Sequence, residues 1–377
     1  MPLYHTAAAT LGFCSCLVIG SAFILGHKFS TRTFWPEVRS HSATIIQYVG
    51  ETCRYLLAAP PQFDPITSEN LDRKNNVRLA FGNGLRSDVW NKFKHRFGIE
   101  TIAEFYAATE SPSALFNTSS NDFSNGAVGR SGLLAASTMG AAVALVQIDW
   151  ENERPLRSVD ANNHCVRVKT GQPGELIYKL DPEDTASTFQ GYYGNPKATE
   201  SKILKDVFVN GDVWYRTGDC LRWDADGRWW FCDRVGDTFR WKSENVSTTE
   251  VSEALGMHPL VNEVNVYGVE LPHHDGRAGC AAVLFSREYD QAMLDQVASH
   301  TQQTLPKYAV PLFLRTVSDI GATGTNKQQK HLLRADGVDP EKVQDTQGDK
   351  IHWLKGGTYV EFENKDWQEM KAGRVKL

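Results

Sequence analysis

The amino-acid sequence predicts an α/β protein in which helices cover β-sheets, with a β-rich part and a smaller α/β domain toward the C-terminus. Residues 44–49 form a β-branched run, and a helical pattern over residues 51–59 follows it. Strands that alternate with helices in this way favour a parallel, helix-covered sheet. Asp226-Gly227 lies between two apolar runs, which is the strongest short-range sign of a tight β-hairpin. Residues 238–335 alternate strands and helices again, so we expect a second domain there.

Length and composition are those of an ordinary globular protein with room for two domains. The chain has 377 residues, of which 41% are hydrophobic and 23% charged, and its net charge is −5 at pH 7. No block of Lys and Arg stands out, so nothing indicates a nucleic-acid partner. The seven cysteines are scattered, and this odd number favours a reducing, intracellular compartment over a disulfide framework.

An apolar run over residues 10–26 is the segment that a hydropathy scan would mark as a membrane candidate. It is short for a bilayer-spanning helix, and Gly12 and Gly20 interrupt it. The residues before it contain no Lys or Arg, so the basic start of a signal peptide is missing. We therefore expect a buried helix followed by a buried strand, with a membrane span as the alternative.

Two predicted strands end in residues that could bind a ligand. Residues 77–81 run into Gly82-Asn83-Gly84, where glycine can either permit a tight turn or bring the backbone close to a nucleotide. The next predicted strand ends in the tyrosine of a YAATE sequence, whose threonine and glutamate can bind a phosphate and a cation.

The stretch 215–253 carries an acidic turn, the hairpin and a Ser247-Thr248-Thr249-Glu250 capping box that opens a helix. Thr217-Gly218-Asp219 places a carboxylate at a strand edge, where it can accept hydrogen bonds from both hydroxyls of a ribose. Arg234 follows the hairpin, and its guanidinium can hold a phosphate through two parallel hydrogen bonds. The spacing suits a nucleotide held between a strand edge and a turn, and a solvated surface hairpin is the alternative.

Residues 233–251, DRVGDTFRWKSENVSTTEV, resemble the signature at the domain junction of adenylate-forming enzymes, the superfamily of acyl-CoA synthetases and luciferases. Within this superfamily, the chain closely resembles the fatty acid transport protein and very-long-chain acyl-CoA synthetase family, including its fungal members. The resemblance covers essentially the whole chain. Such enzymes join a carboxylic acid to AMP using ATP, and then pass the acyl group to coenzyme A.

The resemblance implies how the chain is divided. Residues 1–236 would form the C-terminal part of the large AMP-binding domain, with helix-covered sheets and a small β-rich subdomain. Residues 237–335 would form a small, mobile α+β domain, and residues 336–377 a family-specific extension. Gly236 and Asp237 fall at the hinge about which the small domain rotates between the two half-reactions.

The resemblance also implies which residues bind ATP or AMP and catalyse the reaction. The nucleotide-binding residues would be Gly82, Asn83, Gly84, Tyr106, Thr109, Asp219 and Arg234. Glu110 would be catalytic by holding Mg²⁺, a cation that prefers oxygen ligands and phosphates. Lys327 would be the catalytic residue of adenylation, because an ammonium group reduces the repulsion between the acyl carboxylate and the α-phosphate.

Four positions depart from the family pattern. Ala107 replaces the glycine of YGATE, and we expect a modest penalty from its added methyl group. Ser243 replaces the glycine of RWRGENV, where an added side chain could narrow the path of the pantetheine group. Asn326 and Gln328 flank Lys327 in place of an aromatic and an aliphatic residue.

For the acyl chain, the resemblance implies a pocket to which His5, Tyr48 and Gly129 contribute. Tyr48 could instead be an ordinary core residue, which is the commoner role of a buried aromatic side chain. The length of the bound acid depends on packing that no periodicity reveals. A fatty acid or another hydrophobic carboxylic acid is therefore the expected substrate class.

The phosphate-binding loop of the family, a TSGTTG-like sequence, does not occur in this chain. We therefore expect a fragment or a truncated gene product, with a native protein that lacks the loop as the alternative. A non-catalytic nucleotide- or acyl-binding protein is the alternative to an enzyme. An acyl-CoA ligase of fungal specialised metabolism is the alternative to a fatty acid-CoA ligase.

The C-terminal tripeptide VKL is similar to the peroxisomal address SKL. The resemblance also implies peripheral association with a lipid surface, such as the membrane of the endoplasmic reticulum. We expect an intracellular protein at one of these two places.

Overall fold

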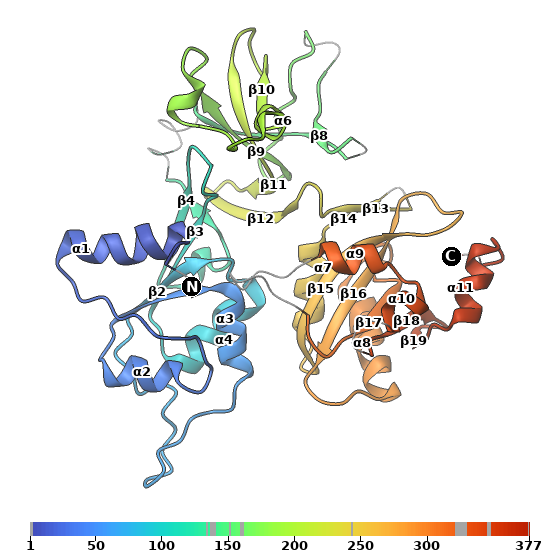
Figure 1. Ribbon diagram of the computed structural model, residues 1–377, viewed down its shortest axis with the longest axis horizontal. Coiled ribbons are helices and arrows are strands. Elements are labelled where there is room, and N and C mark those ends of the chain that lie inside the picture. Colours follow the sequence, from blue (N-terminus) through green and yellow to red (C-terminus); the bar gives the residue numbers. More distant parts are fainter. Residues whose placement is uncertain are drawn as a thin grey trace. The chain divides into compact units, whose positions relative to one another are not determined.

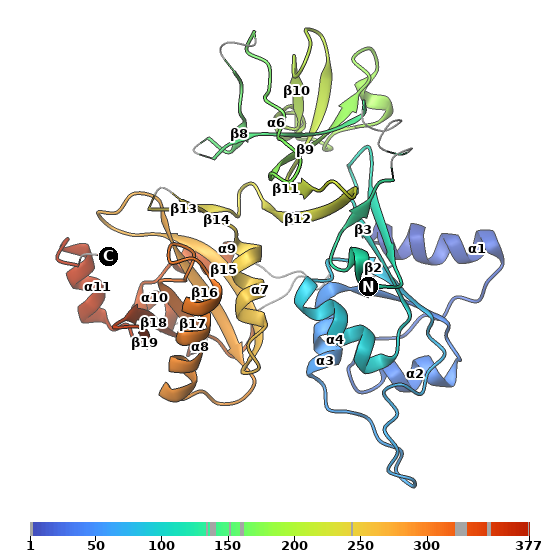
Figure 2. The ribbon, with the colours of Figure 1, turned by 180° about the vertical axis from the view of Figure 1, so that it is seen from behind.

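The computed structural model describes residues 3–132, 135, 141–150, 152–158, 162–242, 244–320, 330–344, 348–375 and 377. These residues form two compact units, which we describe separately. The first unit comprises the described residues of Met1–Asp149 and Pro155–Phe231. The second comprises those of Trp150–Arg154, Cys232–Thr323 and Lys327–Leu377. Figures 1 and 2 show the elements of both units from opposite sides.

The first unit contains a four-stranded sheet in the order β1-β2-β3-β4. Its strands are β1 (Ile45–Val49), β2 (Leu79–Asn83), β3 (Thr101–Tyr106) and β4 (Leu115–Ser119). β1, β2 and β3 are parallel, and β4 is antiparallel to β3. The predicted alternation of strand and helix is confirmed, because parallel neighbours are joined by crossover helices.

Three helices cover one face of this sheet: α2 (Phe34–Ser40), α3 (Gly50–Ala58) and α4 (Ser87–Phe97). α3 and α4 lie side by side in both views of the ribbon (Figures 1 and 2). Their apolar residues share a core with the strands, in which Trp35 stacks on Phe97 with ring centroids 4.5 Å apart. Burial of these rings supplies much of the driving force for this layer.

The segment 10–26 differs from the expectation of a buried helix followed by a buried strand. Its helices are η1 (Ala7–Cys14) and α1 (Ser15–Ile19), and Leu17, Val18 and Ile19 are 64%, 86% and 74% exposed. Gly20, with φ of +69°, ends the helix, and residues 21–26 form no strand. A strand needs a hydrogen-bonding neighbour, which no local pattern can supply. Across the described residues, no helix is long and apolar enough to cross a bilayer.

A second sheet lies in the first unit, except for the last residues of β12, which belong to the second unit. Its order is β5-β12-β11-β9-β6, with β10 paired to β11. Its strands are β5 (Gly129–Arg130), β6 (Val143–Val146), β9 (Gly174–Leu180), β10 (Ile203–Lys205), β11 (Val213–Trp223) and β12 (Arg228–Arg234). Smaller elements are η2 (Asp122–Ser124), β7 (Ile148–Asp149), β8 (Arg154–Pro155), η4 (Thr185–Ser187) and α6 (Pro196–Ser201). The predicted hairpin joins β11 to β12, and Gly227 has the positive φ, +75°, that such turns favour.

The second unit is built on a five-stranded sheet in the order β15-β16-β17-β18-β19. The strands are β15 (Val261–Glu270), β16 (Arg277–Phe285), β17 (Phe313–Thr316), β18 (Lys350–Lys355) and β19 (Thr358–Glu361). The helices are α7 (Thr248–Gly256), α8 (Gln291–Thr304), α9 (His331–Asp336), α10 (Pro340–Gln344) and α11 (Asn364–Lys371). β13 (Phe239–Trp241) and β14 (Glu244–Val246) form a separate hairpin. The predicted capping of α7 is observed, since Ser247 Oγ accepts the Glu250 N–H at 3.2 Å.

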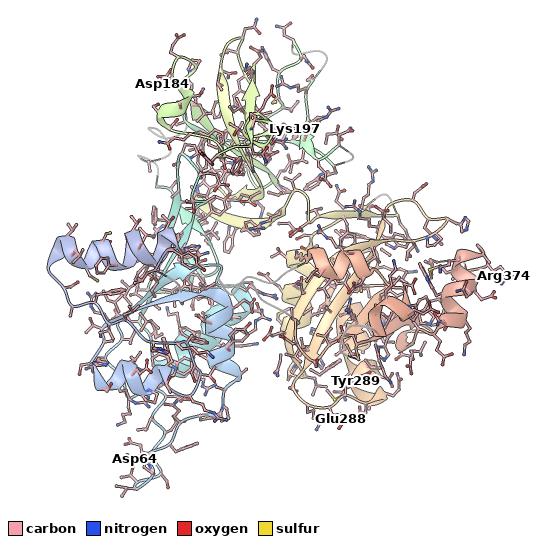
Figure 3. All side chains as sticks on the ribbon, viewed as in Figure 1. Asp64, Asp184, Lys197, Glu288, Tyr289 and Arg374 are labelled. Carbon is pink, nitrogen blue, oxygen red and sulfur yellow. The ribbon has the colours of Figure 1, made fainter. Side chains whose placement is uncertain are left out.

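Arg315 and His352 are among the polar side chains that are buried in the second unit. Arg315 is fully buried and donates to Asp349 at 2.8 Å and to Asp336 at 2.9 Å. His352 lies edge-on to the ring of Tyr289, labelled in Figure 3, with centroids 5.5 Å apart. Burial lowers the pKa of His352 to about 4, so the imidazole is neutral at pH 7.

Candidate active site

The predicted acidic turn is a bulge within β11. The pairing of β11 with β9 shifts register between Arg216 and Cys220, and Gly218 takes a φ of +78° that favours glycine. The Asp219 N–H donates to Oγ1 of Thr217 at 3.1 Å, which stabilises the turn locally. Bulges re-aim side chains beside functional sites. The sheet therefore presents Asp219 from a locally stabilised bulge.

A buried ion pair lies beneath this turn. Arg216 donates from Nε and Nη2 to the two carboxylate oxygens of Glu175, at 2.9 and 2.8 Å. Glu175 is fully buried, and its Oε1 also accepts the Gly218 N–H at 3.2 Å. Sequence reasoning missed this pair, because 41 residues separate its members. The carboxylate of Glu175 thus ties the acidic turn to the neighbouring strand β9.

Tyr106 and Asp219, both predicted to bind the nucleotide, are in direct contact. Tyr106 donates its hydroxyl to Oδ2 of Asp219 at 2.5 Å. Burial and the charge of Asp219 raise the pKa of Tyr106 above its usual value, so the phenol stays protonated and remains a donor. The Tyr106 ring centroid lies 6.4 Å from that of Phe231. The fold therefore brings together an aromatic ring and a carboxylate that are 113 residues apart.

Glu110, the expected Mg²⁺ ligand, is half-buried and accepts a hydrogen bond from the Tyr192 hydroxyl at 2.9 Å. Burial and this hydrogen bond raise the pKa of Tyr192 to about 12. The hydroxyl of Thr109 lies 3.4 Å from that of Thr6. In the described residues, no three His, Cys, Asp or Glu side chains gather as a metal site. Glu110 fits a Mg²⁺ ion of the kind that is bound through one carboxylate, phosphates and water.

The predicted nucleotide loop lies at the end of β2. Gly84 has a φ of +76°, which a residue with a side chain rarely adopts. Among the described residues, Oδ1 of Asn83 is a buried oxygen without a hydrogen-bond partner. Buried acceptors are normally paired, so this oxygen offers a position for a donor group of a ligand.

The three residues predicted to line an acyl pocket lie in different surroundings. Tyr48 lines a cavity of about 550 Å³ between the N-terminal helices and β1, but the residue itself is only 4% exposed. His5 and Gly129 are not among the residues that line this cavity. His5 Nδ1 accepts the Ala7 N–H at 3.2 Å, and buried Gly129 packs against Leu115.

The expected hinge and Arg234 belong to the second unit. The Asp237 N–H donates to the Arg234 carbonyl at 2.9 Å, which closes a turn around Gly236. Asp237 forms ion pairs with Lys330 at 2.9 Å and Arg334 at 2.8 Å. Burial opposes the ionisation of Asp237, but the nearby cations Lys330, Arg334 and Arg234 outweigh it and lower the pKa of this carboxyl. The hinge carboxylate is thus anchored within this unit.

Lys327 lies outside the described residues, as do Ser243, Asn326 and Gln328. Ala107 is exposed. The structure therefore describes all seven predicted nucleotide-binding residues but not the expected catalytic lysine.

Comparisons with known proteins agree with the resemblance. The model of the AMP-binding enzyme family matches residues 1–193, and that of the AMP-binding enzyme C-terminal domain matches residues 250–327. The chain is 41% identical to the very long-chain fatty acid transport protein of Cochliobolus heterostrophus, over the whole chain and 57% of that protein. It is 40% identical to isopenicillin N epimerase component 1 of Hapsidospora chrysogena, again over the whole chain and 62% of that protein.

A solved structure supports the fold. The anthranilate CoA ligase AuaEII in complex with anthranoyl-AMP has a TM-score of 0.67 at 19% identity, covering 88% of this chain and 57% of that one. The chain spans less than two thirds of the length of these proteins. The family-model match extends over half of the chain. The chain belongs to the AMP-binding enzyme family.

Proposed function

We propose that this chain is part of an ATP-dependent acyl-CoA synthetase for a long-chain or very-long-chain fatty acid, or a similar hydrophobic acid. The observation that carries the proposal is the Tyr106–Asp219 contact at the bulge of β11. This contact places a donor-acceptor pair and an aromatic ring where a nucleoside could be held. The fatty acid transport protein names of its relatives suggest the acid and a link to fatty acid uptake.

In the first half-reaction, a carboxylate oxygen of the acid forms a bond to the α-phosphorus of ATP, and pyrophosphate leaves. In this proposal Asp219 accepts hydrogen bonds from the ribose hydroxyls, and Tyr106 positions the adenine. Glu110 would hold Mg²⁺, which would neutralise phosphate charge when bound. Lys327 places its ammonium between the carboxylate and the α-phosphate, which lowers the electrostatic barrier to their approach.

In the second half-reaction, the thiol sulfur of coenzyme A bonds to the acyl carbonyl carbon, the bond from that carbon to the AMP oxygen breaks, and the thiol proton is released to solvent. We propose that residues 237–335 rotate about Gly236 and Asp237 between the two steps, with Arg234 contacting ribose and phosphate. Lys330 and Arg334 hold the Asp237 side chain within the second unit through ion pairs. This supports a pivot in the backbone on the N-terminal side of Asp237.

The binding test uses isothermal titration of ATP with Mg²⁺ into this chain. Asp219→Asn keeps the size of the side chain but removes the charge that accepts the ribose hydroxyls, so we expect affinity to fall at least tenfold. Asp226→Asn is the matched control, because Asp226 lies in the exposed hairpin turn and its side chain is 57% exposed. Equal affinities for Asp219→Asn and the unmodified chain would contradict the proposed site.

An activity test distinguishes the candidate substrates. AMP formation is measured with coenzyme A and a panel of acids from short to very long chains. A second candidate is an acid of specialised metabolism, because the epimerase component is 40% identical to this chain. Preference for long-chain fatty acids supports the first candidate, and preference for an amide- or ring-containing acid supports the second. Nucleotide binding without AMP formation from any acid would favour a non-catalytic nucleotide-binding role for this chain.

We also propose peripheral association with a lipid surface or residence in the peroxisome. The names of the relatives support the first idea, and the C-terminal tripeptide supports the second. Co-sedimentation with vesicles tests the first. Import of a fluorescent fusion, with and without the last three residues, tests the second.

A further inference from the structure

Glu104 is a buried carboxyl group that the proposed reaction does not use. It lies on β3 and is 2% exposed. Gly82 on β2 is its direct partner across the sheet, and Tyr48 on β1 is the partner of Gly82. The three residues therefore form one row across three parallel strands, on the face that the helices cover.

Two donors converge on this carboxyl group. The Tyr48 hydroxyl donates to Oε2 at 2.5 Å, and the Leu85 N–H donates to Oε1 at 3.1 Å. The backbone of Gly84 also favours the charged form of the carboxyl group. Burying a carboxyl group costs free energy unless hydrogen-bond donors surround it. The donors around Glu104 therefore stabilise its burial.

Gly82 makes this arrangement possible through its lack of a side chain. A Cβ atom there would lie 2.6 Å from Cδ2 of the Tyr48 ring and 2.2 Å from the Tyr48 carbonyl oxygen. The ring thus crosses the space above Gly82 to reach Glu104. On the other side, the carbonyl of Gly84 packs directly against Gly50 at the start of α3. The turn after β2 is consequently held between α3 and the Glu104 carboxyl group.

We propose that Glu104 is a positioning residue, which fixes the turn of Gly82, Asn83, Gly84 and Leu85 in the shape that contacts the nucleotide. This inference rests on the proposed function, because only that function places the adenine at the turn. Glu104 touches no reacting atom in this scheme. It acts through the Leu85 N–H, which orients the turn and its buried Asn83 oxygen.

The test combines amide hydrogen exchange with ATP titration in this chain. In the unmodified chain, we expect the Leu85 amide to exchange at least tenfold more slowly than an exposed turn does. Glu104→Leu removes the acceptor at similar volume. We expect it to speed exchange at this amide at least tenfold and to weaken ATP binding at least tenfold. Glu104→Gln keeps one oxygen acceptor, so we expect it to retain ATP affinity within about threefold.

Tyr48→Phe is the comparison variant, because it keeps the ring above Gly82 and removes only the hydroxyl that donates to Glu104. The Leu85 N–H keeps its acceptor in this variant, so we expect exchange at Leu85 to rise less than in Glu104→Leu. An unprotected Leu85 amide in the unmodified chain would overturn the inference even if Glu104→Leu failed to fold. Faster exchange with unchanged ATP affinity in Glu104→Leu would overturn the role in nucleotide positioning. Absence of ATP binding by the unmodified chain would instead contradict the proposed function, while exchange would still report whether Glu104 holds the turn.

Discussion

Replacing Arg216 by Met should destabilise the first unit strongly, because it leaves a buried charge without its partner. Glu175 is fully buried, and Arg216 supplies two of the three hydrogen bonds described above for its carboxylate. Removing one member of a buried ion pair costs about 3–5 kcal/mol in comparable cases. Domains are stable by only about 5–15 kcal/mol, so the loss is a large fraction of the total.

The double variant Glu175→Gln with Arg216→Met provides the critical comparison. The neutral amide of Gln can still accept the Gly218 N–H, and no unpaired charge remains. We therefore expect the double variant to be more stable than Arg216→Met alone, by about 2 kcal/mol or more. Such recovery would show that the cost comes from the uncompensated carboxylate and not from lost packing of the arginine stem.

The assay is urea unfolding at pH 7, followed by tryptophan fluorescence. Trp214, Trp223, Trp229 and Trp230 lie on the strands β11 and β12 and report on this sheet. Because the chain has two compact units, two transitions are analysed separately if they are resolved. A destabilisation below about 1 kcal/mol for Arg216→Met, or a double variant no more stable than the single one, would refute the reasoning.

Three further predictions concern other buried or partly buried polar groups. Burial raises the pKa of Glu104 to about 8 from 4.5. The folded first unit therefore retains a proton that the unfolded chain releases, and its stability should fall between pH 5 and 8 by up to about 1.4 kcal/mol per pH unit. Glu104→Gln should flatten this dependence in urea titrations, and an unchanged slope would contradict it. The pH dependence of stability that His352 causes has the opposite sign, because the pKa of His352 is lowered from 6.5 to about 4. The second unit should lose stability as pH falls from 6.5 to 4, at a similar limiting slope, and His352→Gln should remove the loss. Lys330→Met removes the ion pair with Asp237, so calorimetry should show about 1 kcal/mol less stability in the second unit. No change in its melting temperature would show that solvent replaces this contact without cost.

Much of the local structure could be predicted from the sequence, because it depends on near neighbours. The hairpin at Asp226-Gly227 and the capping of α7 by Ser247 are both observed. Turn chemistry and side-chain capping act within four residues. The apolar segment 10–26 was mispredicted as buried for the opposite reason. Its exposure depends on which other parts of the fold lie against it, and apolarity alone does not specify a partner.

The candidate site was predictable only in part. The resemblance pointed to Asp219 and Tyr106, and the structure shows them in contact. It did not point to Glu175 or Glu104, because a glutamate within an apolar strand looks like an ordinary solvent-facing residue. The burial of Glu175 and Glu104 can be recognised only from the tertiary structure, which shows the hydrogen-bond donors around them. A weak signal was present in Gly82, since glycine inside a strand pattern often marks close approach by another group.

The sequence alone determined the α/β class, the family and the chemistry available at each motif, because these follow from residue types at short spacing. Tertiary structure alone decided which carboxyl groups are buried and what they hold. Glu104 meets Tyr48 across 56 residues, and Glu175 meets Arg216 across 41. The register of strand pairing sets both contacts, because a shift of one strand by one residue would turn its side chains to the opposite face of the sheet. A carboxyl group that faces solvent is unremarkable, but the same group turned inward beneath a glycine turn can hold that turn in place.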